Sequence, residues 1–250
     1  MVDETEQELD LALAAELQAA LLPKACPTNW PHEAAASLNR MCGTVGGDFY
    51  DFIRINDEQF AVVIGDVVGH GVRAALMMAQ IMGFLRSEPQ RRSRPVEVVS
   101  ELNMMLVDLG NRTGSVMPCS LFYAVIDAPT GIGFFVNAGH PRPYLCSDGA
   151  CVPLHLMNRN ILLGVQEYQP EEDCHTFTTG ERLVLFTDGL VEAVNDSHDF
   201  YGEPRLYDTI SRCKECTPCR CAEVVFQDVE QFRGRARQSD DESIVVLDRV

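Results

Sequence analysis

Residues 46–78 read GGDFYDFIRINDEQFAVVIGDVVGHGVRAALMM, and this stretch decides the fold. It contains two runs of strand-forming residues, 48–53 and 60–64, on either side of a polar turn at 56–58, which predicts a β-hairpin. A Gly-His-Gly turn then leads into the almost wholly apolar run 72–85, which predicts a helix buried on most sides. A hairpin followed directly by a buried helix indicates a helix layer packed on an antiparallel sheet.

The remainder of the chain repeats these two themes. A second helix is predicted at 96–109, a further one after Gly189 and another at 223–232. Strands at hairpin spacing are predicted at 120–127, 132–137, 143–146, 150–154, 182–186 and 243–247. Helices embedded among antiparallel hairpins indicate an α+β layered fold and not an alternating parallel βαβ fold.

The N-terminal segment predicts an amphipathic helix. Leucines at 9, 13, 17 and 21 recur every four residues among acidic side chains, and Pro23 ends the pattern. We therefore divide the chain into this helix, 1–23, and one larger domain, 24–250. The leucine stripe either packs on its own domain, the interpretation we prefer, or pairs with a second copy in a homodimer. Since the chain as read leaves no length for a sensor domain ahead of this helix, we expect regulation in trans.

The charge balance excludes several partners. The chain has 37 acidic and 20 basic side chains, a formal net charge of −17. Nucleic acid and anionic membrane would be repelled, so we expect neither as a partner. We find no apolar run long enough to cross a bilayer and no basic signal-peptide start, which predicts a cytoplasmic protein.

Ten cysteines are present. Six are scattered and are expected to be reduced thiols that behave as small apolar side chains: Cys26, Cys42, Cys119, Cys146, Cys151 and Cys174. Four others crowd together between two predicted helices: Cys213, Cys216, Cys219 and Cys221. This cluster is a speculative zinc or redox site, because nearby basic residues favour thiolate; the interpretation we prefer is a segment without a ligand.

Four aspartates carry the chemical signal. Asp66 and Asp188 each follow a predicted strand, whereas Asp48 and Asp240 each precede one. In an antiparallel sheet the end of one strand lies beside the start of its neighbour, so the four carboxylates can share one edge. Clustered carboxylates need cations to offset their repulsion, and hard oxygen ligands fit Mg²⁺ or Mn²⁺. We predict a divalent metal site here, while Asp-Gly as an ordinary turn signal stays an alternative.

A family resemblance supports the same residues. Five motifs occur in the order found in SpoIIE/RsbU-type serine phosphatases, the bacterial branch of the metal-dependent PPM (protein phosphatase 2C-like) family. They are GGDFYD (46–51), IGDVVGHGVRAA (64–75), NAGHP (137–141), LFTDGLVEA (185–193) and Asp240-Asp241. The chain resembles this family from about residue 17 to residue 249.

The resemblance implies a PPM-type α-β-β-α sandwich with two Mn²⁺ or Mg²⁺ ions at one edge. It implies that Asp48, Asp66, Asp188 and Asp240 are the catalytic metal ligands, together with the main-chain carbonyl of Val67; Asp241 is the alternative to Asp240. It further implies that a metal-activated water attacks phosphoserine or phosphothreonine. The substrate in relatives is commonly an anti-sigma factor antagonist with a STAS fold, in a partner-switching pathway.

Some positions depart from the family pattern or have uncertain roles. Glu242-Ser243 follows the Asp-Asp pair where relatives have a small or apolar residue and then threonine, so Glu242 would add a charge near the site. No basic residue lies between 41 and 51, so a phosphate-binding arginine is not evident at that turn. His70, Asp51 and Gly189 are candidates for supporting the metal ligands. His140 is expected to be structural, and for His70 and Asp51 too a structural role is preferred.

The sequence therefore predicts a metal-dependent protein serine/threonine phosphatase. The main alternative is a non-catalytic or gated PPM-fold module that binds a regulatory partner. A phosphodiesterase or nuclease is disfavoured because a polynucleotide would be repelled.

Overall fold

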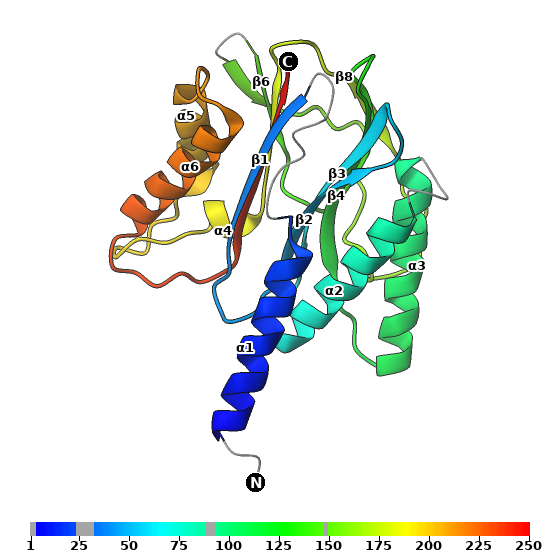
Figure 1. Ribbon diagram of the computed structural model, residues 1–250, viewed down its shortest axis with the longest axis vertical. Coiled ribbons are helices and arrows are strands. Elements are labelled where there is room, and N and C mark those ends of the chain that lie inside the picture. The colour runs from blue at the N-terminus through cyan, green and yellow to red at the C-terminus, as the bar shows by residue number, and fades with distance from the viewer. Residues whose placement is uncertain (1–3, 24–32, 89–93, 148–149) are drawn as a thin grey trace.

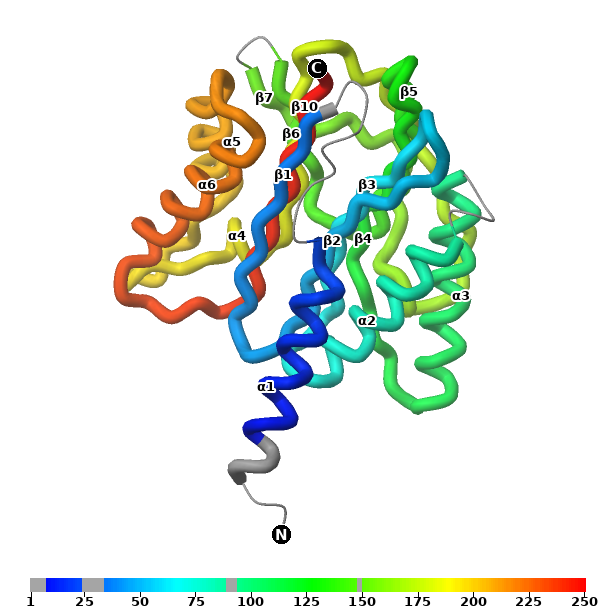
Figure 2. Tube along the Cα trace, viewed as in Figure 1, coloured from blue at the N-terminus to red at the C-terminus, as the bar shows by residue number. Residues whose placement is uncertain are grey.

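The protein forms two antiparallel sheets packed face to face, with helices on both outer sides, in a computed structural model that describes residues 4–23, 33–88, 94–147 and 150–250 (Figure 1). The first sheet has the strand order β1-β10-β9-β6-β7, and the second has the order β2-β3-β4-β5-β8. The tube view shows the two sheets as separate layers (Figure 2). The predicted α+β class and the α-β-β-α sandwich are confirmed.

The strands are β1 (Glu33–Arg40), β2 (Asp48–Arg54), β3 (Gln59–Val67), β4 (Cys119–Asp127), β5 (Ile132–Ala138), β6 (Tyr144–Ser147), β7 (Ala150–Pro153), β8 (Asp173–Thr176), β9 (Arg182–Phe186) and β10 (Glu242–Arg249). The helices are α1 (Glu4–Leu21), α2 (Val72–Ser87), α3 (Pro95–Thr113), α4 (Asp188–Val191), α5 (Gly202–Arg212) and α6 (Pro218–Arg233). Helices α2 and α3 cover the second sheet, and α5 and α6 cover the first (Figure 1).

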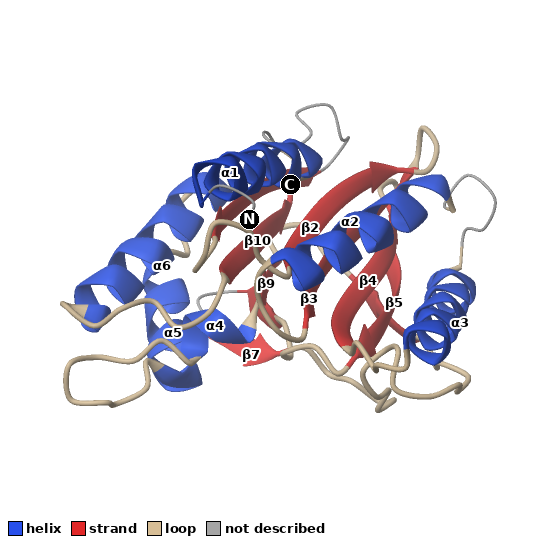
Figure 3. Cartoon of the chain, turned by 90° about the horizontal axis from the view of Figure 1, so that it is seen from below, coloured by secondary structure: helices blue, strands red, loops and turns tan. Residues whose placement is uncertain are grey.

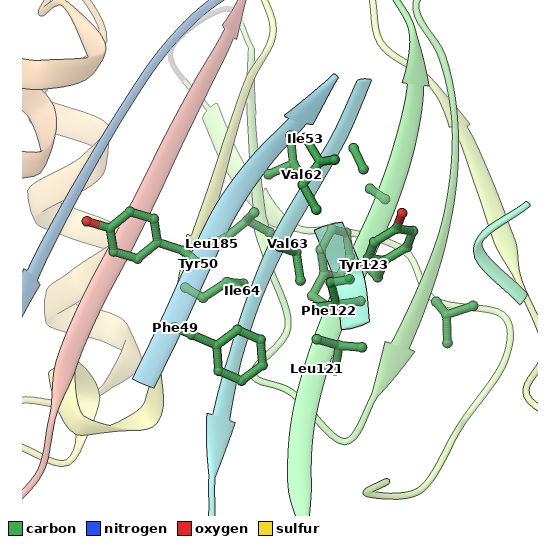
Figure 4. Close-up of a cluster of buried hydrophobic side chains, with 14 of the residues drawn as sticks. Phe49, Tyr50, Ile53, Val62, Val63, Ile64, Leu121, Phe122, Tyr123 and Leu185 are labelled. Carbon is green, nitrogen blue, oxygen red and sulfur yellow. The ribbon is translucent and has the colours of Figure 1, made fainter. Parts of the chain in front are cut away.

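Side chains of the first sheet alternate between two cores. In β9, Leu183 and Leu185 join the core between the sheets, whereas Val184 and Phe186 join the core under α5 and α6. This is the period of two that a strand imposes, and apolar residues on both faces are what a covered strand requires. Figure 4 shows Leu185 among the side chains of the second sheet.

Helix boundaries follow local signals. Pro95 opens α3, and Gly114, with φ 66°, ends it in the left-handed conformation. The turn between β3 and α2 needs Gly69 and Gly71, which have φ of 106° and 78°. In α6, Thr217 accepts a hydrogen bond from the amide of Arg220, 3.3 Å away, and so caps the helix start.

The predicted helices and hairpins form, with ends that move by a few residues. Three elements were not predicted, namely β1, β8 and α5. Helix α6 begins at Pro218 and not at 223 as predicted, so Cys219 and Cys221 lie in its first turn. Of the other predictions, the one on the thiol of Cys26 falls outside the described residues.

The preferred packing of the N-terminal leucine stripe on its own domain is wrong for three of its four leucines. Leu9, Leu13 and Leu17 are 61%, 49% and 71% exposed. The fourth leucine, Leu21, packs against the core, and a different side of α1 faces the domain through Leu11 and Gln18. The first half of α1 extends away from the sandwich (Figure 1).

One cysteine prediction is also corrected. Cys146 and Cys151 face each other across the β6–β7 hairpin and form a disulfide, so these two are not the reduced thiols expected. In the Cys213–Cys221 segment, burial raises the pKa of Cys213, and burial raises that of Cys221 to about 12. Both shifts disfavour thiolate, so the redox hypothesis gains no support from the structure.

None of the described helices is long and apolar enough to cross a membrane.

Candidate active site

Four aspartates converge at one edge of the sandwich, from both sheets. In the second sheet, Asp48 begins β2 and lies directly opposite Asp66 near the end of β3. In the first sheet, Asp188 follows β9 and begins α4, and Asp240 lies two residues before the neighbouring strand, β10. Figure 3 looks toward this edge from below. All four acids therefore lie at the same edge, as the strand ends predicted.

The carboxylates interact electrostatically. Burial, followed by the charges of Asp188 and Asp240, raises the pKa of Asp66 to about 7. Burial and then Asp66 hold the pKa of Asp48 well above its ordinary value. The pKa of Asp240 is also raised, first by burial and then by Asp188. Carboxyl groups that raise one another's pKa values in this way mark a site where the protein alone does not offset the negative charge.

Two hydroxyl groups fix Asp48. Oδ2 of Asp48 accepts hydrogen bonds from Oγ1 of Thr187, at 2.8 Å, and from Oγ of Ser243, at 2.7 Å. The amide of Ser243 in turn donates to Oγ1 of Thr187, 2.9 Å away. All three residues are buried. This network joins the start of β2 to the end of β9 and the start of β10, and it holds the two sheets together at the acidic edge.

Asp241 binds backbone amides. Its Oδ1 accepts from the amide of Cys42 at 2.7 Å, and its Oδ2 accepts from the amide of Gly47 at 2.8 Å. The side chain is only 4% exposed. Because both oxygens serve the β1–β2 loop, Asp241 is a positioning residue, and Asp240 is the better ligand candidate of the pair.

Glu242 does not add free charge to the site. It is 1% exposed, and its carboxylate forms an ion pair with Arg233 and a longer one, at 3.8 Å, with Arg40. Both arginines belong to the first-sheet side of the molecule. The prediction that Glu242 would add a charge near the metal site is therefore corrected, because arginines offset that charge.

Two glycines are required by close backbone approach. A Cβ on Gly47 would lie 2.5 Å from the carbonyl oxygen of Val67 and 3.0 Å from Oδ1 of Asp66. A Cβ on Gly189 would lie 2.0 Å from the carbonyl oxygen of Asp241. Val67 is thus beside Asp66 at the edge, where its carbonyl was predicted to act, and Gly189 packs against the Asp240-Asp241 pair.

A pocket of about 420 Å³ opens beside Asp66 and Asp240. His70 lines it and is exposed; its charge lowers the pKa of Asp240, against the larger effects that raise it. The His70 ring makes no hydrogen bond to the described residues. This differs from the structural role that we preferred from the sequence. Leu11 of α1 also lines this pocket, so the N-terminal helix reaches the site.

Two other candidates have structural contacts. Asp51 is buried and its Oδ2 accepts from Nε of Arg86 at 2.6 Å, which ties β2 to α2. His140 is buried, and its Nδ1 lies 2.9 Å from Oγ of Ser120, the residue opposite Asp66 on β4. Burial lowers the pKa of His140 to about 3, so the ring is neutral. The structural interpretations of both residues agree with these contacts.

Gln18 connects α1 to the site and was not identified from sequence. Its Nε2 donates to the carbonyl of Gly46 at 2.7 Å, and its Oε1 accepts from the amide of Gly46 at 3.0 Å. The pair of bonds is buried and holds the loop that carries Gly47 and Asp48. A glutamine within a run of leucine and alanine gives no signal of this contact, because the partner is backbone.

We expect Gln18→Ala to weaken both stability and activity. Two backbone groups of Gly46 would lose their partners in a buried place, at a cost of about 1–3 kcal/mol in the free energy of unfolding. Because the loop positions Asp48, phosphatase activity should fall by about 10-fold or more. Thermal melting and Mn²⁺-dependent phosphate release measure the two effects. Glu16→Ala, on an exposed side of the same helix, is the control, and equal values for both variants would contradict the role of Gln18.

The residues fit divalent cations by donor type. Asp48, Asp66, Asp188 and Asp240 supply hard carboxylate oxygens, and Gly47 leaves room for the backbone carbonyl of Val67 beside them. Within the described residues, no three His, Cys, Asp or Glu side chains are already arranged around one point as metal ligands. This holds for the four aspartates and for the Cys213–Cys221 segment alike, so ligand roles are proposals in both places.

Comparisons with known proteins agree with this geometry. A family model described as Stage II sporulation protein E (SpoIIE) matches residues 56–250. The phosphoserine phosphatase RsbU of Bacillus subtilis (strain 168) is 25% identical over 253 residues, which cover 98% of this chain and 72% of RsbU. The phosphoserine phosphatase RsbP of the same organism is 24% identical over 206 residues, covering 82% of this chain. The match covers only 49% of RsbP, so this chain corresponds to about half of that relative.

Solved structures share the fold. The SiaA-PP2C domain of Pseudomonas aeruginosa superposes with a TM-score of 0.83 at 22% identity, over 99% of each chain. The catalytic domain of the serine/threonine phosphatase PstP, solved in complex with two manganese ions, superposes with a TM-score of 0.63 at 14% identity, over 86% of this chain and 97% of PstP.

The two-sheet sandwich with acids at one edge is that of the PPM, or PP2C-type, class of phosphatases. Within that class the chain belongs to the SpoIIE family, because the family model covers more than three quarters of it. The resemblance on which the sequence prediction relied is confirmed.

Proposed function

We propose that this chain is a metal-dependent protein serine/threonine phosphatase. The observation that carries the proposal is the convergence of Asp48, Asp66, Asp188 and Asp240 at one edge, with raised pKa values for three of them. Two divalent cations bound there would relieve the repulsion among these carboxylates. We further propose that the substrate is a phosphorylated regulatory protein of the anti-sigma factor antagonist type, with a STAS fold; the relatives named phosphoserine phosphatase support the phosphoserine specificity.

Each residue has a defined part in this proposal. Asp66, Asp188 and Asp240 would hold the cations from two sheets, with the carbonyl of Val67 beside them. Asp48 is fixed by Thr187 and Ser243 through Oδ2, and its other oxygen would be the ligand. Bound Mn²⁺ or Mg²⁺ supplies a nucleophilic water at neutral pH and neutralises phosphoryl charge. His70, exposed at the pocket, would interact with the leaving group of the substrate.

The test is phosphate release from a phosphoserine peptide and from p-nitrophenyl phosphate in Mn²⁺ or Mg²⁺. We expect hydrolysis of both, with none after chelation by EDTA. A folded protein that is inactive in both metals would overturn the proposal, and metal-independent binding of a regulatory partner would then favour the gated-module alternative.

We also propose that α1 forms a homodimer. Leu9, Leu13 and Leu17 make an exposed apolar stripe at helical spacing on a helix that extends from the sandwich. The opposite contacts of α1, through Gln18 and Leu11, reach the active-site loop and pocket. A dimer through the stripe would therefore change the packing of α1 beside the site, which gives a route for regulation.

We expect Leu13→Asp to shift the protein from dimer to monomer at micromolar concentration, as measured by sedimentation. Val152→Asp replaces an apolar residue of similar exposure, 55%, in the β6–β7 hairpin and should leave the dimer intact. A wild-type protein that is monomeric, with unchanged activity after deletion of residues 1–16, would contradict the dimer.

A further inference from the structure

Five exposed arginines have no ion-pair partner among the described residues, and we name them the arginine rim: Arg73, Arg142, Arg159, Arg235 and Arg237. Most other basic side chains of the described chain are paired with a carboxylate, as Arg182 is with Asp248 at 2.6 Å. In a chain with a net charge of −17, acidic partners are plentiful, so unpaired arginines are unexpected.

Two members of the arginine rim lie near the acidic edge, Arg73 on the side of the second sheet and Arg142 on the side of the first. Arg73 lies in the first turn of α2, directly after the loop that leaves β3, and it donates to Ser115 and Met117 just before β4. Arg142 lies between the end of β5 and the start of β6. Because Tyr144 pairs with Val184 on β9, Arg142 lies near the level of Phe186, two residues before Asp188.

The other three lie in segments at the same edge. Arg159 precedes Asn160, which forms a β-bridge with Ala138 at the end of β5. Arg235 and Arg237 lie in the α6–β10 segment that leads to Asp240. All five therefore lie in loops, or in the first turn of α2, at the acidic end of the sandwich.

Exposed apolar side chains lie in the segments around Arg73. Val68 and Val72 flank the β3–α2 turn, and Val116 precedes β4; they are 55%, 53% and 57% exposed. The amide of Val68 donates to the carbonyl of Pro118 at 2.9 Å, so these segments are contiguous. Arginine and exposed apolar residues occur together at protein–protein interfaces. This surface is therefore better suited to bind a folded protein than a polymer of phosphates.

We propose that this edge docks a protein face that carries carboxylates around the phosphoserine, an inference that rests on the proposed phosphatase function. The acidic site itself would repel such a face, but bound cations would offset that charge, and the arginine rim would then supply the attraction. Charge complementarity of this kind raises the association rate and selects the partner, and it weakens with salt. The arginine absent from the 41–51 turn is thus replaced by arginines on the surrounding loops.

The test compares three phosphoserine peptides of equal length, with glutamate, neutral or lysine residues around the phosphoserine. In Mn²⁺ and low salt, we expect kcat/KM of the wild type to be at least about 10-fold higher for the acidic peptide than for the neutral one. The preference should shrink at 300 mM salt. In Arg142→Glu/Arg159→Glu, the ratio of acidic to neutral should fall to one or below.

The matched control is Arg54→Glu/Arg220→Glu. Both arginines are exposed, and they lie in the distal hairpin of β2 and the first turn of α6, away from the acidic edge. This double variant carries the same change in net charge and should keep the wild-type ratio. If the ratio of acidic to neutral peptide fell by the same factor in both double variants, the effect would be one of net charge. That result would overturn the proposed role of the arginine rim.

Binding of fluorescently labelled peptides by anisotropy gives the same ratio without turnover. If p-nitrophenyl phosphate is not hydrolysed, the proposed function fails, while the binding ratio still decides the docking inference. Equal affinity for the acidic and neutral peptides, or tighter binding to lysine peptides, would overturn it. Tighter, salt-sensitive binding to single-stranded DNA or phosphatidylserine vesicles than to the acidic peptide would overturn it as well.

Discussion

Asp66→Asn should abolish metal-dependent hydrolysis and at the same time stabilise the metal-free protein. Loss of a carboxylate between Asp48, Asp188 and Asp240 removes a proposed ligand, and we expect kcat to fall about 10³-fold or more, equivalent to about 4 kcal/mol. The same change removes a charge that the metal-free fold disfavours, as the raised pKa of Asp66, about 7, records. Function and stability therefore change in opposite directions.

The sign of the pH dependence follows from that shift. Between the ordinary pKa of an aspartate and about 7, the folded protein binds more protons at Asp66 than the unfolded chain does. Asp66 therefore lowers stability progressively as pH rises through this window, and its cost is complete above it. We expect Asp66→Asn to gain about 2–4 kcal/mol over the wild type at pH 8 without metal, and nothing at pH 4.

Thermal melting with EDTA at the two pH values measures this difference. Comparing variant with wild type at each pH cancels the titration of groups on which Asp66 does not act, such as His140, whose lowered pKa destabilises the fold in acid. Asp57→Asn, an exposed carboxylate in the distal hairpin turn, is the control and should change neither activity nor its pH profile. A variant that is less stable than the wild type at pH 8 would show that the carboxylates do not repel one another.

Gly189→Ala should have the second largest effect. The new methyl group would lie 2.0 Å from the carbonyl oxygen of Asp241 and 3.3 Å from Cβ of Asp240. Because the first of these atoms is backbone, α4 and the segment before β10 must separate. We expect a loss of more than about 3 kcal/mol of stability and of at least about 100-fold in activity.

Gly83→Ala is the matched control for this substitution. No atom lies within 4 Å of the added Cβ, and the residue is exposed within α2. It should stabilise the protein by about 0.5–1 kcal/mol, since alanine restricts the unfolded chain and favours helix. If Gly189→Ala melted and reacted like Gly83→Ala, the close packing at Asp240-Asp241 would be wrong.

Much of the fold was predictable because its strongest elements carry clear patterns. The hairpin β2–β3 and the helix α2 alternate or repeat apolar residues as their periods demand. By contrast, β1 has the sequence Glu-Ala-Ala-Ala-Ser-Leu-Asn-Arg, whose alanines favour helix. It is a strand because all eight residues pair with β10, a tertiary contact with no local signal. The four-residue edge strand β8 is too short for a period to show.

The site divides in the same way. The four aspartates were identified because each lies next to a strong strand signal. The residues that position them were missed: Thr187, Ser243 and Gln18 act through partners 28 to 195 residues away in sequence. Glu242 was misjudged for a different reason: its partner Arg233 is only nine residues away, but the sequence does not show that the end of α6 folds back on the start of β10.

The initial rate of phosphate release from a phosphoserine peptide, measured against free Mn²⁺ for wild type and Asp188→Asn side by side, tests the central claim most directly. Asp188 is distant in sequence from Asp48 and Asp66 and comes from the other sheet, so its role depends on the convergence of the acids. We predict no rate in EDTA, a saturable rise with Mn²⁺ for the wild type, and background rates for Asp188→Asn at every concentration. A wild-type rate that persists in EDTA, or an Asp188→Asn protein with the full wild-type rate, would contradict the account.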